Sequence, residues 1–362
     1  MRRIMYISSL STSLSDDEIR SIGRISSRNN KKIDVTGVLL FAHEFFFQIL
    51  EGEQVIVESL VEKIRRDPRH RDFLILKCED GVSTRLFPNW SMRTVRLEES
   101  QGMILQAVRL MLETIAESHR IIERYTQPSV LHLLTQGINP LEIPPKAVDR
   151  IILFGDMVGF SLLSERFPTE EVTLAVNTYL ELCSKRIIEF GGEVSKYIGD
   201  CVMAHFPAEA PDAAIEACVK ALGDLQHFRA GVAGGRLRKY LFGGFGLTRG
   251  QVIEGNIGST IKMDYTILGE EVNRAQRLES LTRVIHRALA VSRAVRENAK
   301  SDWGFECAGE FELKGHSGTC PVYTIADPVV ADFRDSSELA LMLAAAPDGP
   351  LAKGPAAPGR SP

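Results

Sequence analysis

The chain has 362 residues, a formal net charge of -4 and 44% hydrophobic residues, a balance typical of a globular protein with enough chain for about two domains. The composition lacks the surplus of Lys and Arg found in nucleic-acid binders, so we expect no nucleic-acid partner. No apolar run is long enough to span a membrane, and the N-terminus MRRIMYISSLSTS lacks the apolar segment of a signal peptide. These features predict a cytoplasmic protein with no membrane partner. The six cysteines form no C-x-x-C pair, which favours reduced, mostly buried thiols over zinc ligands or disulfides.

The first hundred residues alternate predicted strands and helices. Strands are predicted at YIS, VTGVLLF, FFFQILEG and FLILKC, followed by an extended stretch. The first helix begins after Ser15, because Ser15 and Glu18 have the spacing of a capping box. Apolar residues recur on one face of each helix, at Ile19, Ile22 and Ile25 in the first and at Val57, Leu60, Val61 and Ile64 in the second. This order predicts a small α+β sheet domain over residues 1–100, with the helix faces covering the sheet.

Residues 101–126 are predicted to form one long helix. Its apolar row, broken only by a histidine, has the alternating three- and four-residue spacing of a coiled-coil seam: Leu105, Val108, Leu112, Ile115, His119 and Ile122. The competing interpretation is an amphipathic helix packed on its own domain, because the row is shorter than a sustained heptad repeat. The position between two domains favours the coiled coil. Prolines and glycines then predict a connector, so the linker spans residues 101–147.

The second half of the chain reads as strand, helix, hairpin, helix, hairpin, helix, strand, helix and a last strand pair. This order predicts an α/β sandwich over residues 148–327. Residues 328–362 end in LAAAPDGPLAKGPAAPGRSP, which is rich in Ala, Pro and Gly. Such a composition leaves little to bury, so we expect a disordered tail over residues 328–362.

Two aspartates end predicted strands of this second domain. Asp156 follows RIILFG, and Asp200 lies in the turn of the hairpin GGEVSKYIGDCVMAHF. Asp after Gly is common in tight turns for reasons of backbone geometry alone. If the two strands are neighbours, however, the two carboxylates can converge on magnesium ions that bridge a triphosphate. The backbone amides after Asp156 could then hold the phosphates.

Three further polar residues of this domain are candidates for binding a ligand. Asn273 and Arg277 are four residues apart in YTILGEEVNRAQRLE and therefore share a helical face, from which Arg277 can clamp a phosphate. A solvated face is the alternative for such a pair alone. Lys196 lies inside a predicted strand, where it either donates to a ligand or protects an edge against aggregation.

Five segments, in order, resemble the catalytic domain of class III nucleotidyl cyclases over residues 148–326: FGDMVGFS, GGEVSKYIGDCVMAHF, GNIGS, DYTILGEEVNRAQRLE and ELKG. The resemblance implies a ferredoxin-like cyclase fold and a head-to-tail homodimer whose active sites draw on both protomers. It also implies in-line attack of the ribose 3'-oxygen of ATP on the α-phosphorus, with release of pyrophosphate. Asp156 and Asp200 match the metal-binding aspartates for Mg²⁺ or Mn²⁺, and we include Met157 in the metal set.

The same resemblance assigns the remaining site residues. Lys196 and Thr266 occupy the positions that read the base, and this pair favours adenine. Asn273 matches the residue that orients the ribose, Arg277 the one that stabilises the transition state, and Lys314 of ELKG a phosphate-binding lysine.

The first domain carries a different set of motifs. Gln48 lies inside the aromatic strand FFFQILEG, where burying an amide costs free energy unless its donors and acceptors are bonded. The segments YISSL, NNKKIDVTGVLLF, FFFQILEGE, IRRDPRH and LFPNWSM resemble a BLUF domain, a ferredoxin-like blue-light sensor that binds FAD or FMN, over residues 1–100.

The BLUF resemblance implies residue roles in a photocycle. Tyr6 would give an electron and a proton to the flavin, and Gln48 would change its hydrogen bonding, which Trp90 and Met92 would carry to the linker helix. The flavin-binding candidates are Asn30, Asp67 and Arg69, with Asn29 and His70 beside them.

Together the two motif sets predict a blue-light-activated adenylyl cyclase that uses ATP. One alternative is a flavin photoreceptor whose degenerate cyclase domain acts as a light-switched scaffold, because Arg274 and Gln276 depart from the cyclase pattern beside Arg277. The other is guanylyl or mixed specificity, which Lys196 and Thr266 disfavour.

Overall fold

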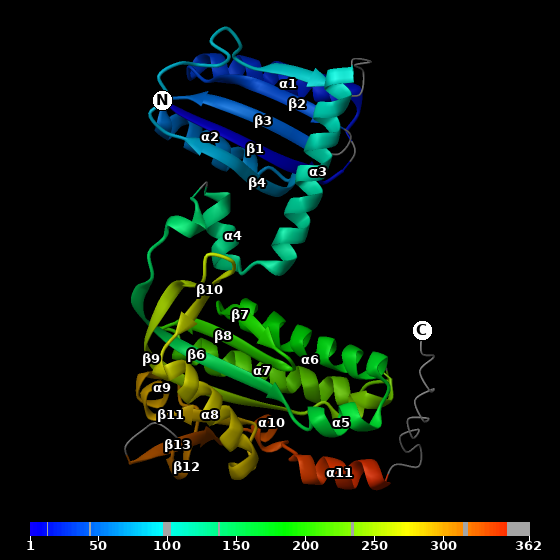
Figure 1. Cartoon of the computed structure of the whole chain (residues 1–362), viewed down its shortest axis with the longest axis vertical. Coiled ribbons are helices and arrows are strands. Elements are labelled where there is room, and N and C mark those ends of the chain that lie inside the picture. The colour runs from blue at the N-terminus through cyan, green and yellow to red at the C-terminus, as the bar shows by residue number, and fades with distance from the viewer. Residues whose placement is uncertain are drawn as a thin grey trace. The chain divides into compact units, whose positions relative to one another are not determined.

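The computed structural model describes residues 1–12, 14–42, 45–96, 103–136, 138–232, 235–313 and 318–345. The chain divides into two compact units, Met1–Ile143 and Pro144–Pro362, both drawn in Figure 1. The division falls close to the boundary predicted at residue 147. None of the described helices is long and apolar enough to cross a bilayer.

The first unit is a five-stranded sheet with the order β4-β1-β3-β2-β5. Its elements are β1 (Arg2–Leu10), α1 (Asp16–Lys32), β2 (Thr36–Ala42), β3 (Phe45–Gly52), α2 (Gln54–Arg65), β4 (His70–Glu79) and β5 (Arg93–Arg96). Neighbouring strands are antiparallel except β2 and β5, which are parallel. The β1-α1-β2-β3-α2-β4 order confirms the predicted ferredoxin-like fold.

Side-chain alternation along β1 separates the two faces of this sheet. Tyr6 points into the core beneath α1 and α2, and Ile7 points into a second cluster on the opposite face. The predicted capping box is present, with the side chains of Ser15 and Glu18 each bonded to the other's backbone amide. Ile19 is buried as expected, but Ile25 is 47% exposed, so the predicted apolar face is shorter than the periodicity indicates.

The linker helix α3 (Met103–Tyr125) packs partly on its own unit (Figure 1). Leu112 is buried against the sheet together with Ala116, and Val108 packs on the same cluster. The coiled-coil prediction is therefore wrong for Leu112, which faces the sheet rather than a second helix. The predicted row does continue onto open surface at Ile122. The side chain of Leu105 lies outside the described residues. Helix α4 (Pro128–Thr135) and a 3-10 turn (Pro140–Glu142) follow.

The second unit contains an eight-stranded sheet with the order β12-β13-β11-β9-β6-β8-β7, and β10 pairs with β9. The strands are β6 (Lys146–Met157), β7 (Glu193–Ile198), β8 (Cys201–Pro207), β9 (Gly243–Gly258), β10 (Met263–Leu268), β11 (Leu289–Ser292), β12 (Phe305–Glu312) and β13 (Thr319–Ile325). The helices of this sandwich are α5 (Phe160–Arg166), α6 (Thr169–Glu189), α7 (Pro211–Ala230), α8 (Glu270–Ile285) and α9 (Arg293–Asn298). Because β8 is the neighbour of β6, the strand that ends with Asp156 lies beside the strand that Asp200 directly precedes.

Helices cover both faces of this sheet. Ile151 and Leu153 point into a large core with α6 and α7, whereas Ile152 and Phe154 point toward α8. Asp156 continues the second series, so it lies on the face that α8 covers. Cys183 and Cys218 are buried in the large core, but Cys307 is exposed, so the prediction of buried thiols holds for only part of the set.

Helix α8 lies unusually close to β9 because that strand carries glycines at the contact. A Cβ atom on Gly246 would fall 2.3 Å from the backbone of both Ala275 and Glu279. Gly244, the β9 partner of Asp156, would bring a Cβ within 3.2 Å of a Glu279 carboxylate oxygen. The glycines of GGFGLTRG thus set the position of the helix over the sheet.

The prediction of disorder from residue 328 is wrong for the first part of this segment. Helices α10 (Pro328–Ala331) and α11 (Ser336–Ala345) bury Val330, Phe333 and Leu339 in the core of the second unit. The apolar residues of VVADF and LALML supply the surface to bury, and the composition of the end of the chain concealed them. Residues 346–362 lie outside the described residues.

Candidate functional site

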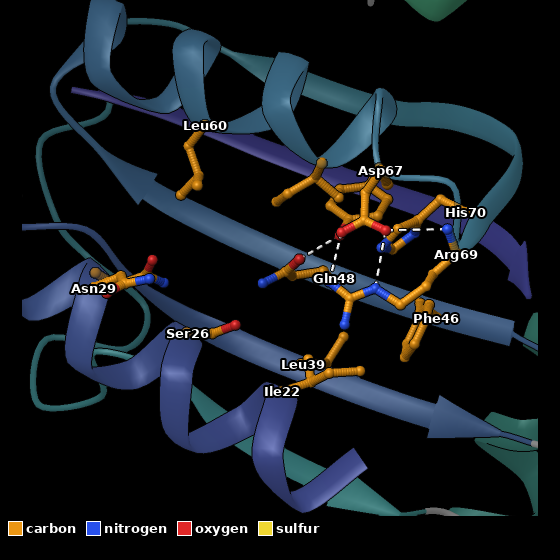
Figure 2. A pocket seen from close by; sticks show the side chains of 13 residues that line it. Ile22, Ser26, Asn29, Leu39, Phe46, Gln48, Leu60, Asp67, Arg69 and His70 are labelled. Atoms are coloured by element: carbon orange, nitrogen blue, oxygen red, sulfur yellow. Dashed lines mark hydrogen bonds and ion pairs between the residues drawn. The ribbon is translucent and has the colours of Figure 1, made fainter. Parts of the chain in front are cut away.

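A cavity of about 120 Å³ in the first unit lies between α1, α2 and the sheet (Figure 2). Its lining includes every residue predicted to contact a flavin ring or to act on it directly: Tyr6, Asn29, Asn30, Gln48, Asp67, Arg69 and His70.

A series of buried, hydrogen-bonded side chains leads from this cavity to the segment before the edge strand β5. Tyr6 and Gln48 are register partners on β1 and β3, and the Tyr6 hydroxyl donates to Gln48 Oε1. Gln48 Nε2 donates in turn to Met92 Sδ at 3.3 Å. Both ends of the Gln48 amide are therefore bonded, which offsets the cost of burying it. Met92 directly precedes β5, so Gln48 is bonded to the segment that enters this strand.

Trp90, which the sequence analysis groups with Met92, is not part of the hydrogen-bonded series Tyr6–Gln48–Met92. Its ring stacks on Phe87 at 5.2 Å between centroids, and the guanidinium of Arg93 lies 4.7 Å from its centroid. Asn30 provides a separate tie, because its Nδ2 donates to the backbone oxygen of Ser91 at 3.0 Å. The segment before β5 is thus held from α1 through Asn30 and from β3 through Gln48.

The electrostatics of the cavity combine one ion pair with neutral hydrogen-bonding groups. Asp67 accepts from Arg69 Nε at 2.9 Å (Figure 2), and hydrogen bonds from Arg69 lower the pKa of Asp67 to about 2. Burial lowers the pKa of His70 to about 4 and raises that of Tyr6, so both rings are neutral at pH 7. Amide, guanidinium and carboxylate groups beside apolar walls fit a flavin, whose ring system has apolar faces and a polar edge.

The metal-binding candidates of the second unit meet at the ends of β6 and β8. Gly155 of β6 pairs with Val202 of β8, which brings Asp156 next to the β7–β8 turn that carries Asp200. Burial raises the pKa of Asp200 to about 6, and the negative charge of Asp156 adds to this shift. Two converging carboxylates of this kind fit divalent cations, because a cation relieves their repulsion.

Met157 is a poor candidate for a metal ligand. Its side chain is 1% exposed and belongs to the apolar core, and a thioether is a soft ligand unsuited to magnesium. Of Met157, only the backbone is therefore available to a cation.

Two residues of α8 that the sequence analysis missed lie near the metal-binding candidates, and one of them contacts Asp156. Arg283 Nη2 donates to Asp156 Oδ2 at 2.8 Å, and Arg283 Nη1 donates to Glu279 Oε1 at 2.5 Å. Burial raises the pKa of Glu279 to about 7, a shift that the charge of Arg283 opposes. The four-residue spacing of Glu279 and Arg283 signals their own ion pair. Nothing in the sequence signals the contact with Asp156, which lies 127 residues away.

The predicted base-reading residues gather at the edge of the sheet. Lys196 Nζ donates to Asp264 Oδ2 at 2.5 Å, and Asp264 lies two residues before Thr266 on β10, hence on the same face. Thr266 is buried, and among the described residues its Oγ1 has no hydrogen-bond partner. Sequence analysis missed Asp264, although the two-residue alternation with Thr266 could have identified it.

The catalytic candidates on α8 face a different direction. Asn273 is exposed and Arg277 half-buried, and their side chains have no hydrogen bond or ion pair within the part of the chain that the structure describes. Arg277 and Arg283 are six residues apart, which turns their side chains about 120° from each other around the helix. Because Arg283 points at Asp156, Arg277 points away from it. Lys314 lies outside the described residues.

The two residues that depart from the cyclase pattern have local explanations. Arg274 forms an ion pair with Glu271 of its own helix at 2.9 Å, and Thr248 donates to the same carboxylate at 2.7 Å. Gln276 is exposed. This geometry weakens the scaffold alternative, which these two residues alone supported.

Comparisons with known proteins agree with both halves of this geometry. Residues 1–93 match the BLUF family, described as sensors of blue light using FAD, and residues 144–327 match the adenylate and guanylate cyclase catalytic domain. A solved structure of a bacterial light-regulated adenylyl cyclase matches with a TM-score of 0.86 and 41% sequence identity, over 94% of this chain and 98% of that chain.

Curated relatives point the same way. Photoactivated adenylate cyclase subunit beta of Euglena longa is 30% identical over 296 residues, and subunit alpha of Euglena gracilis is 32% identical over 295. Each match covers 81% of this chain, but 34% and 29% of those two proteins, so this chain spans about a third of their length.

Proposed function

Because the chain belongs to the family of light-regulated adenylyl cyclases, in which a BLUF domain precedes an adenylate and guanylate cyclase catalytic domain, we propose that it converts ATP into cyclic AMP and pyrophosphate under the control of blue light. The observation that carries the proposal is the convergence of Asp156, at the end of β6, and Asp200, in the β7–β8 turn, in a chain whose other unit holds Tyr6 and Gln48 beside a cavity.

The proposed sensor acts through the buried chain from Tyr6 to Met92. Bound flavin, which we take to be FAD, supplies absorption of blue light and an electron-accepting excited state. Tyr6 would serve as the donor of an electron to that state and of its hydroxyl proton to Gln48 Oε1, with which it is already hydrogen-bonded, and both would return to Tyr6 so that the flavin ends in its original redox state. Gln48 then changes tautomer or rotamer, and its bond to Met92 Sδ is altered. The light signal is limited to the free energy by which the two Gln48 states differ in their contact with this segment.

The proposed reaction uses residues of two chains. When bound, two Mg²⁺ ions lower the pKa of the ribose 3'-hydroxyl and neutralise phosphate charge. Asp156 and Asp200 hold these ions, while Asn273 and Arg277 of a second copy orient the ribose and stabilise charge on the transferring phosphorus. The direction of Arg277, turned away from the Asp156 of its own chain, supports this division.

Selection of ATP is assigned to Lys196 and Asp264, with Thr266 beside them. Adenine presents an acceptor at N1 and a donor at its 6-amino group, whereas guanine presents the opposite pattern. A lysine donor held against a carboxylate acceptor is complementary to the adenine edge. Replacing the lysine donor by an acceptor and the carboxylate acceptor by a donor would favour GTP.

The dimer that this site requires is proposed to use α3. Several large apolar side chains on this helix remain exposed, although Leu112 is buried on the sheet: Leu110, Met111, Ile121, Ile122 and Tyr125. An exposed apolar stripe of this kind is typical of an interaction surface. We propose that α3 of a second copy packs on this surface, because the proposed catalytic site needs two copies.

The test is formation of cyclic AMP from MgATP by the purified flavin-bound protein, measured in darkness and then in blue light on one sample. We expect a light-dependent rise, smaller by at least tenfold when GTP replaces ATP. A reversible flavin spectral shift with no cyclic nucleotide in either condition would contradict the cyclase assignment and favour the scaffold.

A further inference from the structure

Helix α8 presents functional side chains on two sides. Asn273 and Arg277 have no side-chain partner among the described residues of their own chain, whereas Glu279 and Arg283 bind within it. The second pair lies beside Asp156, because Gly244, the β9 partner of Asp156, has no side chain and so lets Thr282 and Glu279 of α8 approach the sheet there. One helix therefore serves the proposed active site of a partner and touches a metal-binding carboxylate of its own chain.

Arg283 is shared between two carboxylates of unequal depth. The Glu279 side chain is 6% exposed and that of Asp156 is 26% exposed, with Arg283 at 28% between them. Arg283 occupies Oδ2 of Asp156, one of the two oxygens that this residue can offer to a cation. A positive guanidinium at 2.8 Å from that oxygen also repels a cation bound there.

We propose that Arg283 is a positioning residue that competes with a divalent cation for Asp156, and that it moves wholly to Glu279 when the cation binds. The inference rests on the proposed role of Asp156 as a metal ligand. The guanidinium has two donor nitrogens in use, one for each carboxylate, so release of Asp156 leaves the other contact intact.

Glu279 lowers the free-energy cost of moving Arg283 away from Asp156. Breaking a buried ion pair by removing one partner is strongly destabilising, because a charge is left uncompensated. Here Arg283 keeps a carboxylate partner in both states, and Asp156 exchanges a guanidinium for a cation. Arg283 consequently sets the cation concentration at which the site fills, without being required to hold the fold together.

The experiment measures Mn²⁺ binding directly, on the full-length flavin-bound protein in darkness, from the electron paramagnetic resonance signal of free Mn²⁺. We expect Arg283→Gln to bind Mn²⁺ about five- to tenfold more tightly than the unaltered protein, because a competing positive charge is removed. Arg283→Lys should fall between the two, since an ammonium keeps the charge but loses the forked geometry. A merely structural role for Arg283 would weaken binding instead.

Arg287 provides the matched control. It lies four residues further along the chain and carries the same charge, but its Nη1 donates to the backbone oxygen of His286 rather than to a carboxylate. Arg287→Gln should leave Mn²⁺ binding unchanged. In an Asp156→Asn background, Arg283→Gln should lose its effect, because the two residues act on one contact.

Mn²⁺ binding by Arg283→Gln that is equal to or weaker than that of the unaltered protein would overturn the inference. If Arg283→Gln fails to retain flavin, Mn²⁺ binding is measured in Arg283→Lys instead. Unchanged Mn²⁺ binding in that variant would also overturn the inference. A different result, in which the unaltered protein binds no Mn²⁺ and Asp156→Asn changes nothing, would remove the proposed metal site and this inference with it.

Discussion

The cavity of the first unit and the carboxylate site of the second differ in whether their side chains find bonding partners within one chain. Two hydrogen bonds link Tyr6 to Gln48 and Gln48 to Met92, all within the first unit. In the second unit, Asp156 is bonded to Arg283, but Arg277 has no partner among the described residues. The difference is consistent with the two proposals: the proposed sensor needs the residues of one unit alone, whereas the proposed catalytic site needs a second copy to complete it.

The largest expected effect breaks the second site alone. Asp200→Asn should lower cyclic AMP formation in light by about 10²- to 10³-fold, because one of two cation-binding carboxylates is lost. The flavin spectral shift should remain, since the substitution lies in the other unit. Asp149→Asn is the matched control, at the opposite end of β6 and paired with Arg249 at 2.9 Å. Full activity of Asp200→Asn would remove this residue from the site.

The next effect breaks the first site alone. Tyr6→Phe removes the hydroxyl that donates to Gln48 and should abolish the light-induced spectral shift. The ratio of cyclic AMP formation in light to that in darkness should then fall to about one. Tyr323→Phe serves as the control, because Tyr323 lies on β13 of the second unit, where its ring contacts Arg296 rather than the cavity of the first unit. A normal photocycle in Tyr6→Phe would contradict the role of Tyr6 as donor.

A smaller effect tests the packing that positions α8 over the carboxylates. Gly246→Ala should destabilise the second unit by about 2 kcal/mol or more, because its Cβ would overlap the helix backbone. Gly223→Ala is the control on α7, where a Cβ meets nothing within 4 Å and alanine should favour the helix. Urea unfolding of both variants measures the difference. Equal stability would show that α8 is free to shift.

The smallest effect concerns pH and the first unit. The folded state lowers the pKa of His70 from 6.5 to about 4, so the unfolded chain binds more protons between these values. The free energy of unfolding should therefore fall as the pH is lowered through this window. His70→Asn should flatten that slope, and His227→Asn, whose ring is exposed, should not. Urea titrations at pH 7 and pH 5 measure it, and an unchanged slope in His70→Asn would assign the pH dependence elsewhere.

Local patterns predicted local structure well. The Ser15 capping box and the β7–β8 hairpin around Asp200 were confirmed because each depends on residues a few positions apart. The tail prediction failed because composition averages over a segment. The apolar residues near Leu339 are few, and their burial depends on a core built by distant strands.

The sequence by itself determined the order of the elements, the two families of motif, and the placement of Asp156 and Asp200 at strand ends. Tertiary structure alone decided which charges meet. Lys196 pairs with Asp264 across 68 residues and Arg283 with Asp156 across 127. Both contacts depend on strand order, and the second also depends on the glycines that admit α8. Periodicity reports only on neighbours within a turn of helix or along one strand, whereas sheet order brings together residues that share no local pattern.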